Sequence, residues 1–127
     1  MPSLIEHYTH PGTSGGAPLS PAVRTGDYVW ISGQVPFDAE GIVAGHEIVA
    51  QTHQVMRNVE AALKLAGCTM DDVCKTTVWL QDARDFGKFN AAYASYFPNG
   101  FPARTTSEAR LMANILVEVE AVAYKPR

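Results

Sequence analysis

The last strand predicted by the sequence has one apolar face and one charged face. Successive residues of a strand point to opposite sides of a sheet, so Glu118 and Glu120 share one face. The residues of the other face are Val117, Val119, Ala121 and Ala123. Because an apolar row of this kind covers a hydrophobic core, we expect a sheet packed on one side only. Its other side then faces water, a ligand or another subunit.

A second strand, which follows Phe101, carries an arginine among apolar and hydroxyl side chains. By the same alternation, Arg104, Thr106, Glu108 and Arg110 point to one side. We expect Arg104 and Thr106 to lie on the uncovered side of the sheet, together with the two glutamates. Burying an ionised group is costly unless it is paired. The face is therefore a candidate ligand or subunit interface.

The remaining elements follow from hydrophobic spacing and from turn residues. We predict strands at 22–24 and 28–32, a helix at 47–66, a strand at 73–80, a helix from 85 to 97, and strands at 104–111 and 116–124. In the second helix, the aromatic residues Phe86, Phe89, Tyr93 and Phe97 are interpreted as core packing. The order β-β-α-β-α-β-β predicts one α+β domain over residues 1–127, with two helices on one face of the sheet.

Composition favours self-association and argues against nucleic acid as a partner. Charged residues make up 18% of the 127-residue chain, against about 25% in typical proteins. Packing of the bare sheet face against other copies would explain so little charge. The net charge is −3 and no run of Lys or Arg occurs, so nothing in the sequence suits a phosphate backbone.

Neither the cysteines nor the histidines have metal-site spacing. Cys68 and Cys74 form no CxxC pair, and the four histidines are scattered. The first residues lack the basic and apolar regions of a signal peptide, and no apolar stretch approaches the roughly 20 residues of a membrane span. We therefore expect a cytoplasmic protein with reduced thiols.

Five short motifs, in order along nearly the whole chain, resemble the RidA/YjgF family, also called L-PSP endoribonuclease-like. The motifs are residues 32–36 (SGQVP), 75–78 (KTTV), 90–93 (NAAY), 101–104 (FPAR) and 117–121 (VEVEA). The resemblance implies a chorismate-mutase-like fold of the bacillus type, with a mixed sheet. It also implies a homotrimer whose sheets form a central barrel, with ligand sites between subunits. The implied activity is hydrolysis of reactive enamines and imines, such as 2-aminoacrylate, to 2-keto acids and ammonia, without metal or cofactor.

The resemblance also implies roles for particular residues. Arg104 would hold the substrate carboxylate, assisted by backbone groups near Gly33 and Thr106, and Asn90 would line the pocket. Glu118 would position the attacking water. A guanidinium suits this task because its planar fork binds a carboxylate through two hydrogen bonds, whereas lysine offers a point charge.

Two positions depart from the pattern of many members with this activity. Leu19 stands where a tyrosine is common, and Thr106 stands where a cysteine is common. Both departures fall in the implied pocket, so we expect a changed substrate, such as another imino acid or a ring-derived enamine.

Several alternatives remain open at the level of sequence. Arg104 could form an interface ion pair with Glu118 or Glu120, either glutamate could be purely structural, and Asn90 could be an ordinary helix-side hydrogen bonder. The chain could bind a small carboxylate without catalysis, as a regulator, or act as an endoribonuclease or translation inhibitor. A weaker alternative is tautomerase chemistry by an N-terminal Pro2 amine.

Overall fold

The computed structural model describes residues 4–12 and 16–127, so Pro2 and part of the turn-rich opening lie outside the described residues. Its elements, with η marking a short 3-10 helix, are β1 (Ile5–Tyr8), β2 (Ala22–Thr25), β3 (Tyr28–Gln34), α1 (Ile48–Leu65), η1 (Met70–Asp72), β4 (Val73–Leu80), η2 (Ala83–Asp85), α2 (Phe86–Ala94), β5 (Ala103–Glu108) and β6 (Val117–Tyr124). The strands form one sheet in the order β1-β2-β3-β6-β4-β5.

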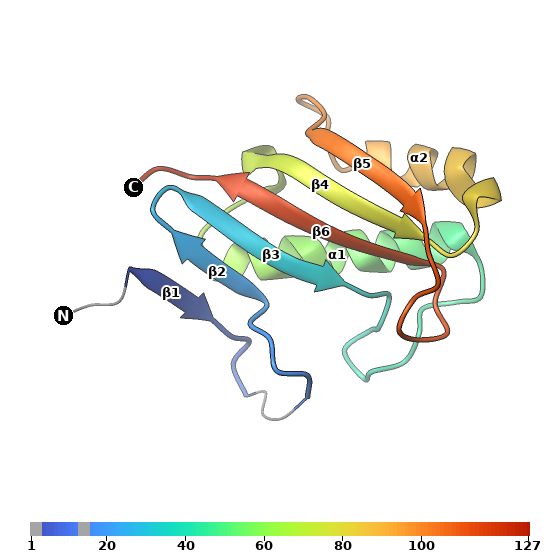
Figure 1. The fold of residues 1–127 in the computed structure, drawn as a ribbon, viewed down its shortest axis with the longest axis horizontal. Helices are drawn as coiled ribbons and strands as arrows, with labels where there is room; N and C mark the ends of the chain where they lie inside the picture. Colours follow the sequence, from blue (N-terminus) through green and yellow to red (C-terminus); the bar gives the residue numbers. More distant parts are fainter. Residues whose placement is uncertain (1–3, 13–15) are drawn as a thin grey trace.

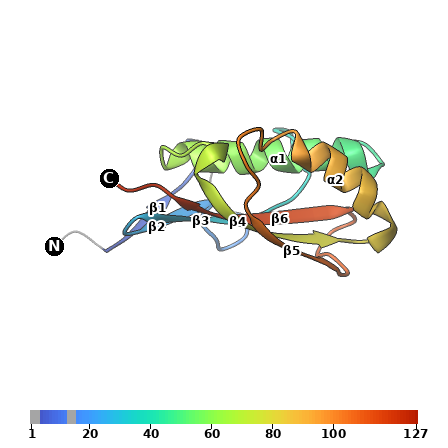
Figure 2. The ribbon, with the colours of Figure 1, turned by 90° about the horizontal axis from the view of Figure 1, so that it is seen from above.

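The sheet is mixed, and both long helices lie on one of its faces. Strand β6 runs antiparallel to β3 and to β4, so these two run parallel to each other with β6 between them. Strands β4 and β5 pair directly in parallel. Figure 1 shows the six strands, and Figure 2 shows α1 and α2 on the same side of the sheet. The α+β architecture expected from the sequence is confirmed.

The core lies between the helices and the apolar face of β6. The predicted apolar row of that strand is at most 2% exposed, namely Val117, Val119, Ala121 and Ala123. Helix α1 contributes Val55, Met56, Val59 and Leu63, all fully buried. Glu47 begins this helix by accepting hydrogen bonds from the amides of Val49 and Ala50, and Gly67 ends it with φ of 76°.

Four local predictions differ from the structure, and the first is that strand β5 ends at Glu108 and not at residue 111. Strand β1 was not expected, because its four residues carry no alternating apolar pattern and it forms only by pairing with β2. Helix α2 ends at Ala94, three residues before the predicted end, and a tighter turn carries the chain to a buried Phe97. Phe86 is 47% exposed and is not in the core, because it occupies the first turn of α2 near the sheet edge.

The face of the sheet opposite the helices carries exposed aromatic side chains. Tyr28, Trp30 and Tyr124 are each nearly half exposed, and the ring of Tyr28 contacts the other two rings. Glu118 and Glu120 lie on this same face, because their neighbours in β6 point into the core. Within the described part of the chain, no helix is long and apolar enough to span a bilayer.

Candidate functional site

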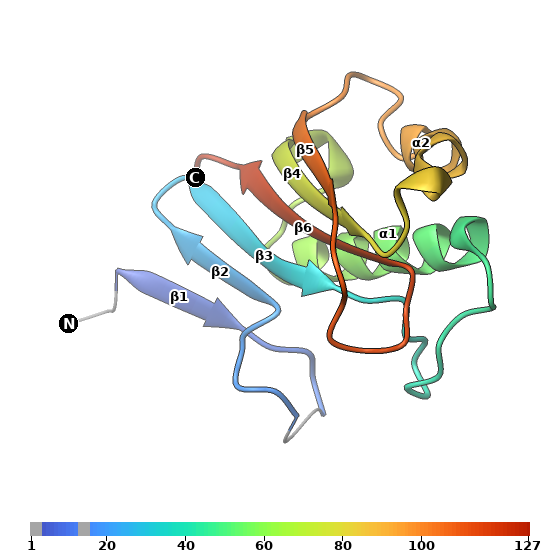
Figure 3. The same ribbon diagram turned by 45° about the vertical axis from the view of Figure 1, so that its right-hand side comes forward.

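The parallel pairing of β4 and β5 places α2 against the arginine. A direct parallel connection needs a crossover segment, and here that segment is η2 and α2. Figure 3 shows α2 beside β4 and β5, at the edge of the sheet farthest from β1. Arg104 is the second residue of β5 and pairs with Thr76, which is 1% exposed on the helix-covered face. Its side chain therefore points toward α2.

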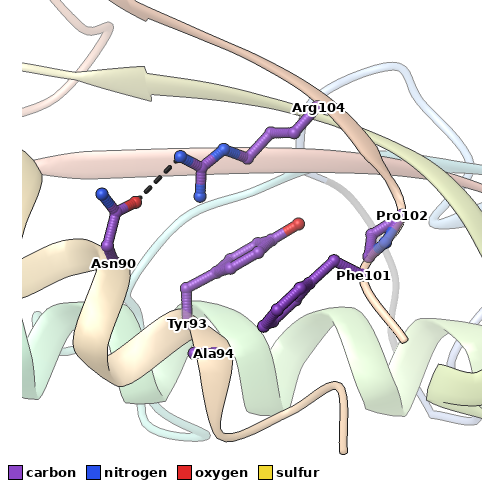
Figure 4. Close-up of a pocket in the computed structure, with 6 residues that line it drawn as sticks. All are labelled: Asn90, Tyr93, Ala94, Phe101, Pro102 and Arg104. Atoms are coloured by element: carbon purple, nitrogen blue, oxygen red, sulfur yellow. Dashed lines mark hydrogen bonds between the residues drawn. The ribbon is translucent and has the colours of Figure 1, made fainter. Parts of the chain in front are cut away.

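The Arg104 guanidinium lies among aromatic rings and next to one amide. Its central carbon is 4.9 Å from the ring centre of Tyr93 and about as close to the rings of Phe86 and Phe89, at 5.6 and 5.5 Å. Its Nη2 atom donates a hydrogen bond of 2.8 Å to Asn90 Oδ1 (Figure 4). Contacts with ring faces attract a cation and hold the guanidinium in place without neutralising its charge.

A cavity of about 330 Å³ opens beside this guanidinium. It is lined by Asn90, Tyr93, Ala94, Phe101, Pro102 and Arg104. Among the described residues, no carboxylate lies within ion-pair distance of Arg104. A guanidinium has five N–H donors and no acceptor, so the Asn90 oxygen must face it and the Asn90 amide nitrogen is left to donate elsewhere. A half-buried cation at the edge of a cavity is an arrangement that can bind an anion.

The structure contradicts the prediction that Arg104 and Thr106 share a face with the glutamates. Both lie on the helix-covered face of β5, because they pair with Thr76 and Val78 of β4, which are buried there. Glu118 pairs with Trp79 and lies on the opposite face. A single chain therefore does not bring Arg104 and Glu118 together, and the alternative of an ion pair between them does not apply within one chain.

Glu118 lies against the backbone of Gly33. A methyl group added to Gly33 would overlap the Glu118 carboxylate, with the carboxyl carbon 3.1 Å away. Burial raises the pKa of the Glu118 carboxyl, and the charge of Glu120 raises it further. A carboxylate with a raised pKa is a stronger proton acceptor, which suits a general base.

Two hydrogen bonds from Ser32 hold the loop that carries Leu19 next to Gly33. The Ser32 hydroxyl donates to the Ser20 carbonyl at 2.6 Å, and the Ser32 amide donates to the Pro21 carbonyl at 3.0 Å. Leu19 itself is 58% exposed.

The six site residues expected from the sequence thus fall into two groups within a chain. Asn90 and Arg104 form the arginine cluster, and Thr106 lies two residues farther along β5 on the same face. Gly33 and Glu118 form the glutamate cluster, and the loop that carries Leu19 is bonded to Ser32 next to it.

Sequence reasoning missed the aromatic floor of the arginine cluster. Tyr93 is buried below the guanidinium, and its hydroxyl shares a 2.7 Å hydrogen bond with the buried hydroxyl of Thr76. Burial raises the pKa of Tyr93, so the phenol stays protonated. The spacing of Phe86, Phe89 and Tyr93 was visible in the sequence, but it was interpreted only as core packing. A motif arginine opposite such a row is the signal that could have revealed the floor.

Thr106 lines a second cavity of about 300 Å³, together with Leu80, Phe86 and Glu108. The Glu108 carboxylate accepts a hydrogen bond of 2.7 Å from the backbone amide of Ala83. In the ranges 4–12 and 16–127, no group of three or more His, Cys, Asp or Glu residues is arranged to hold a metal ion.

Comparison with known proteins gives consistent matches over most of the chain. A family model described as Endoribonuclease L-PSP matches residues 13–125. A RutC family protein of Pyrococcus horikoshii is 44% identical over 110 residues, which is 85% of this chain and 87% of that protein. Proteins named 2-iminobutanoate/2-iminopropanoate deaminase are 40% identical in Mus musculus and 37% identical in Salmonella typhimurium. Each of these alignments covers 85% of this chain, and 82% and 88% of those proteins respectively.

Solved structures show the same fold. A protein of the Rid family from Yersinia pestis superimposes with a TM-score of 0.88 at 33% identity, covering 94% of this chain and 98% of its own. The YjgF gene product of E. coli superimposes with a TM-score of 0.80 at 33% identity, covering 93% and 92% of the two chains.

Proposed function

Because this chain belongs to the Endoribonuclease L-PSP family, which includes the Rid and YjgF proteins, we propose that it hydrolyses 2-imino acids and their enamine tautomers to 2-keto acids and ammonia. The observation that carries the proposal is the unpaired Arg104 guanidinium at the edge of a cavity, held by Asn90 and aromatic rings. The imine deaminase names of two relatives indicate the same chemistry.

In the proposed reaction, Arg104 holds the substrate carboxylate through two parallel hydrogen bonds. The Asn90 oxygen accepts from the guanidinium and so helps to hold it in one orientation. Holding the substrate at this end fixes the position of the imine carbon, which is already electrophilic. The arginine cluster thus acts by binding and orientation.

Glu118 supplies the proton acceptor. Water adds to the carbon of the protonated imine and gives one proton to Glu118, which leaves a neutral carbinolamine. Glu118 returns that proton to the nitrogen. The carbon–nitrogen bond then breaks as the carbonyl forms, the hydroxyl proton passes to the Glu118 carboxylate, and ammonia takes it up and leaves as ammonium. The raised pKa of Glu118 favours the first transfer, because it makes the carboxylate a stronger proton acceptor.

We further propose that each complete site combines the arginine cluster of one copy with the glutamate cluster of another, in a homotrimer. Two observations support a shared site. Arg104 and Glu118 lie on opposite faces of the sheet in one chain. The face that carries Glu118 is not covered by helices and presents exposed aromatic rings.

Removal of the guanidinium tests the binding role. Imino acids are generated in solution by an amino-acid oxidase, and ammonia release is followed with the variants Arg104→Ala and Arg104→Lys. We expect the alanine variant to lose at least about 10²-fold in kcat/KM and the lysine variant to lie between it and the wild type. An alanine variant as active as the wild type would refute the proposal.

Mixing two inactive variants tests the shared site. Arg104→Ala and Glu118→Gln are unfolded together and refolded as mixed oligomers. If the site is shared, about a quarter of the sites in an equal mixture carry both functional residues, and activity returns. If both residues acted within one chain, the mixture would stay inactive. Refolded samples of each variant alone serve as controls.

The same wild-type and variant proteins distinguish imine hydrolysis from two other functions. A non-catalytic carboxylate binder would bind 2-keto acids by calorimetry without accelerating ammonia release. A ribonuclease is suggested by the family description, but the net charge of −3 gives no attraction for RNA. Cleavage of RNA that survives Glu118→Gln and Arg104→Ala would point to a separate activity.

A further inference from the structure

The cavity beside Arg104 has a polar end and an apolar end. Figure 4 shows Arg104 and Asn90 grouped at one end, Phe101 and Pro102 at the other, and the ring of Tyr93 between them. The lining residues belong to α2, to the segment that leads into β5 and, for Arg104, to β5 itself. We call this space the Phe101 cavity. Its shape suits a molecule with a carboxylate at one end and an apolar group at the other.

The Phe101 cavity is larger than a three-carbon imino acid requires. Its volume of about 330 Å³ lies at the lower end of the range for pockets that hold drug-sized ligands, about 300 to 1,000 Å³. The Phe101 ring is 69% exposed although it borders this cavity. A substrate with only a methyl side chain would leave the Phe101 ring exposed to water, whereas a larger side chain would cover the ring.

The charges of the lining exclude other kinds of side chain. Among the described residues of one chain that line it, Arg104 is the only charged one, and none is a carboxylate. A cationic side chain that entered the apolar end would meet no carboxylate of this lining. A second anionic group would compete with the carboxylate for the same donors. The lining therefore favours an uncharged, apolar side chain.

We propose that the Phe101 cavity is a side-chain pocket that selects 2-imino acids with branched aliphatic or aromatic side chains over the three-carbon imino acid. The inference rests on the proposed function, since it places the carboxylate on Arg104. Ala94 and Phe101 then determine specificity, Ala94 by leaving space and Phe101 by covering the apolar group.

Binding of keto-acid products tests the inference without requiring turnover. The dissociation constants of pyruvate and phenylpyruvate are measured by calorimetry. Removing a benzyl-sized apolar area from water is worth more than one methylene, so we expect phenylpyruvate to bind the wild type at least about tenfold more tightly. Equal affinities in the wild type would overturn the inference.

Two variants assign the preference to this cavity. Ala94→Leu fills it and Phe101→Ala removes its exposed wall; each is expected to reduce the preference to about twofold or less while pyruvate binding changes little. The matched control is Ala91→Leu, on an exposed position of the same helix outside the lining, which keeps the wild-type preference. If both variants keep it too, the apolar group binds elsewhere and the inference fails. If Ala94→Leu does not fold, Phe101→Ala still tests the inference, because Phe101 is exposed.

The two proposals fail in different ways. If phenylpyruvate is preferred but no imine is hydrolysed, the pocket exists and the deaminase proposal is wrong. If imines are hydrolysed but side-chain size has no effect on binding, the deaminase proposal stands and the pocket inference is wrong.

Discussion

The carboxyl carbon of Glu118 lies 3.1 Å from the point that a methyl group on Gly33 would occupy. Gly33 belongs to β3 and Glu118 to β6, so this contact joins two neighbouring strands in the middle of the sheet. The φ angle of Gly33 is not positive, so the position needs glycine for its lack of a side chain and not for backbone freedom.

We therefore expect Gly33→Ala to displace the Glu118 carboxylate and lower the deamination rate. A displacement of about 1 Å costs about 10²-fold in rate when it misplaces a catalytic group. Ammonia release and thermal unfolding are measured together. Gly87→Ala in α2 is the matched control, because an added methyl group has no described neighbour within 4 Å. For this control we expect unchanged activity and about 0.5 to 1 kcal/mol of added stability. Full activity of the Gly33 variant would show that the placement of Glu118 is not critical.

Glu118→Gln should make the fold more stable at neutral pH while it removes activity. A carboxyl whose pKa is higher in the folded chain than in the unfolded chain binds protons more readily when folded. Its contribution to stability is greatest below the unfolded pKa, about 4.3, and is lost as the pH rises through the folded value. We expect the Tm difference between variant and wild type to increase from pH 4 to pH 7. Glu40→Gln, in an exposed loop, is the control and should show no such increase. A constant difference would contradict the raised pKa.

The buried hydrogen bond between Tyr93 and Thr76 should show coupling in a double-mutant cycle. Tyr93→Phe leaves the Thr76 hydroxyl without its partner, and Thr76→Val does the same to Tyr93. Each is expected to cost about 1 to 2 kcal/mol, because a buried polar group is left unpaired. The double variant should cost clearly less than the sum, since both partners are then gone. The free energy of unfolding in urea gives all three values; strict additivity would mean that the two hydroxyls do not support each other.

Asn90→Asp should inactivate the arginine cluster by giving it an internal anion. The new carboxylate would lie where the Asn90 oxygen now accepts from Arg104 at 2.8 Å, and it would neutralise the guanidinium. We expect pyruvate to bind at least about tenfold more weakly and the fold to be no less stable. Asn90→Leu is the control, which removes the hydrogen bond without adding charge and should weaken binding less. Tighter binding by the aspartate variant would show that Arg104 is not the anion site.

The sequence predicted the elements better than it predicted which side chains meet. The apolar row of β6 was predicted correctly because alternation within one strand decides which residues share a face. Alternation does not decide which side of the sheet a face belongs to, and this is why Arg104 was placed wrongly. That assignment depends on pairing with Thr76 across β4, a contact between distant parts of the chain.

The exposure of Phe86 could not be predicted for a similar reason. Helical spacing aligned it with Phe89 and Tyr93, but the start of α2 at the sheet edge leaves its ring only partly covered. Gly33 and Glu118 meet because β3 pairs with β6, and the loop of Leu19 reaches β3 through the bonds of Ser32; no local pattern reveals either contact.

The arginine cluster and the Phe101 cavity both come from one continuous stretch, the unit β4-α2-β5, whereas Gly33 and Glu118 come from strands outside it. Substitutions within that stretch can therefore alter what is recognised without touching the residues that we propose to direct hydrolysis. With this division, mutations confined to one stretch can change the preferred substrate in the course of evolution. A chimaera that takes residues 83–106 from a relative should inherit that relative's choice of ligand while retaining its own hydrolytic half.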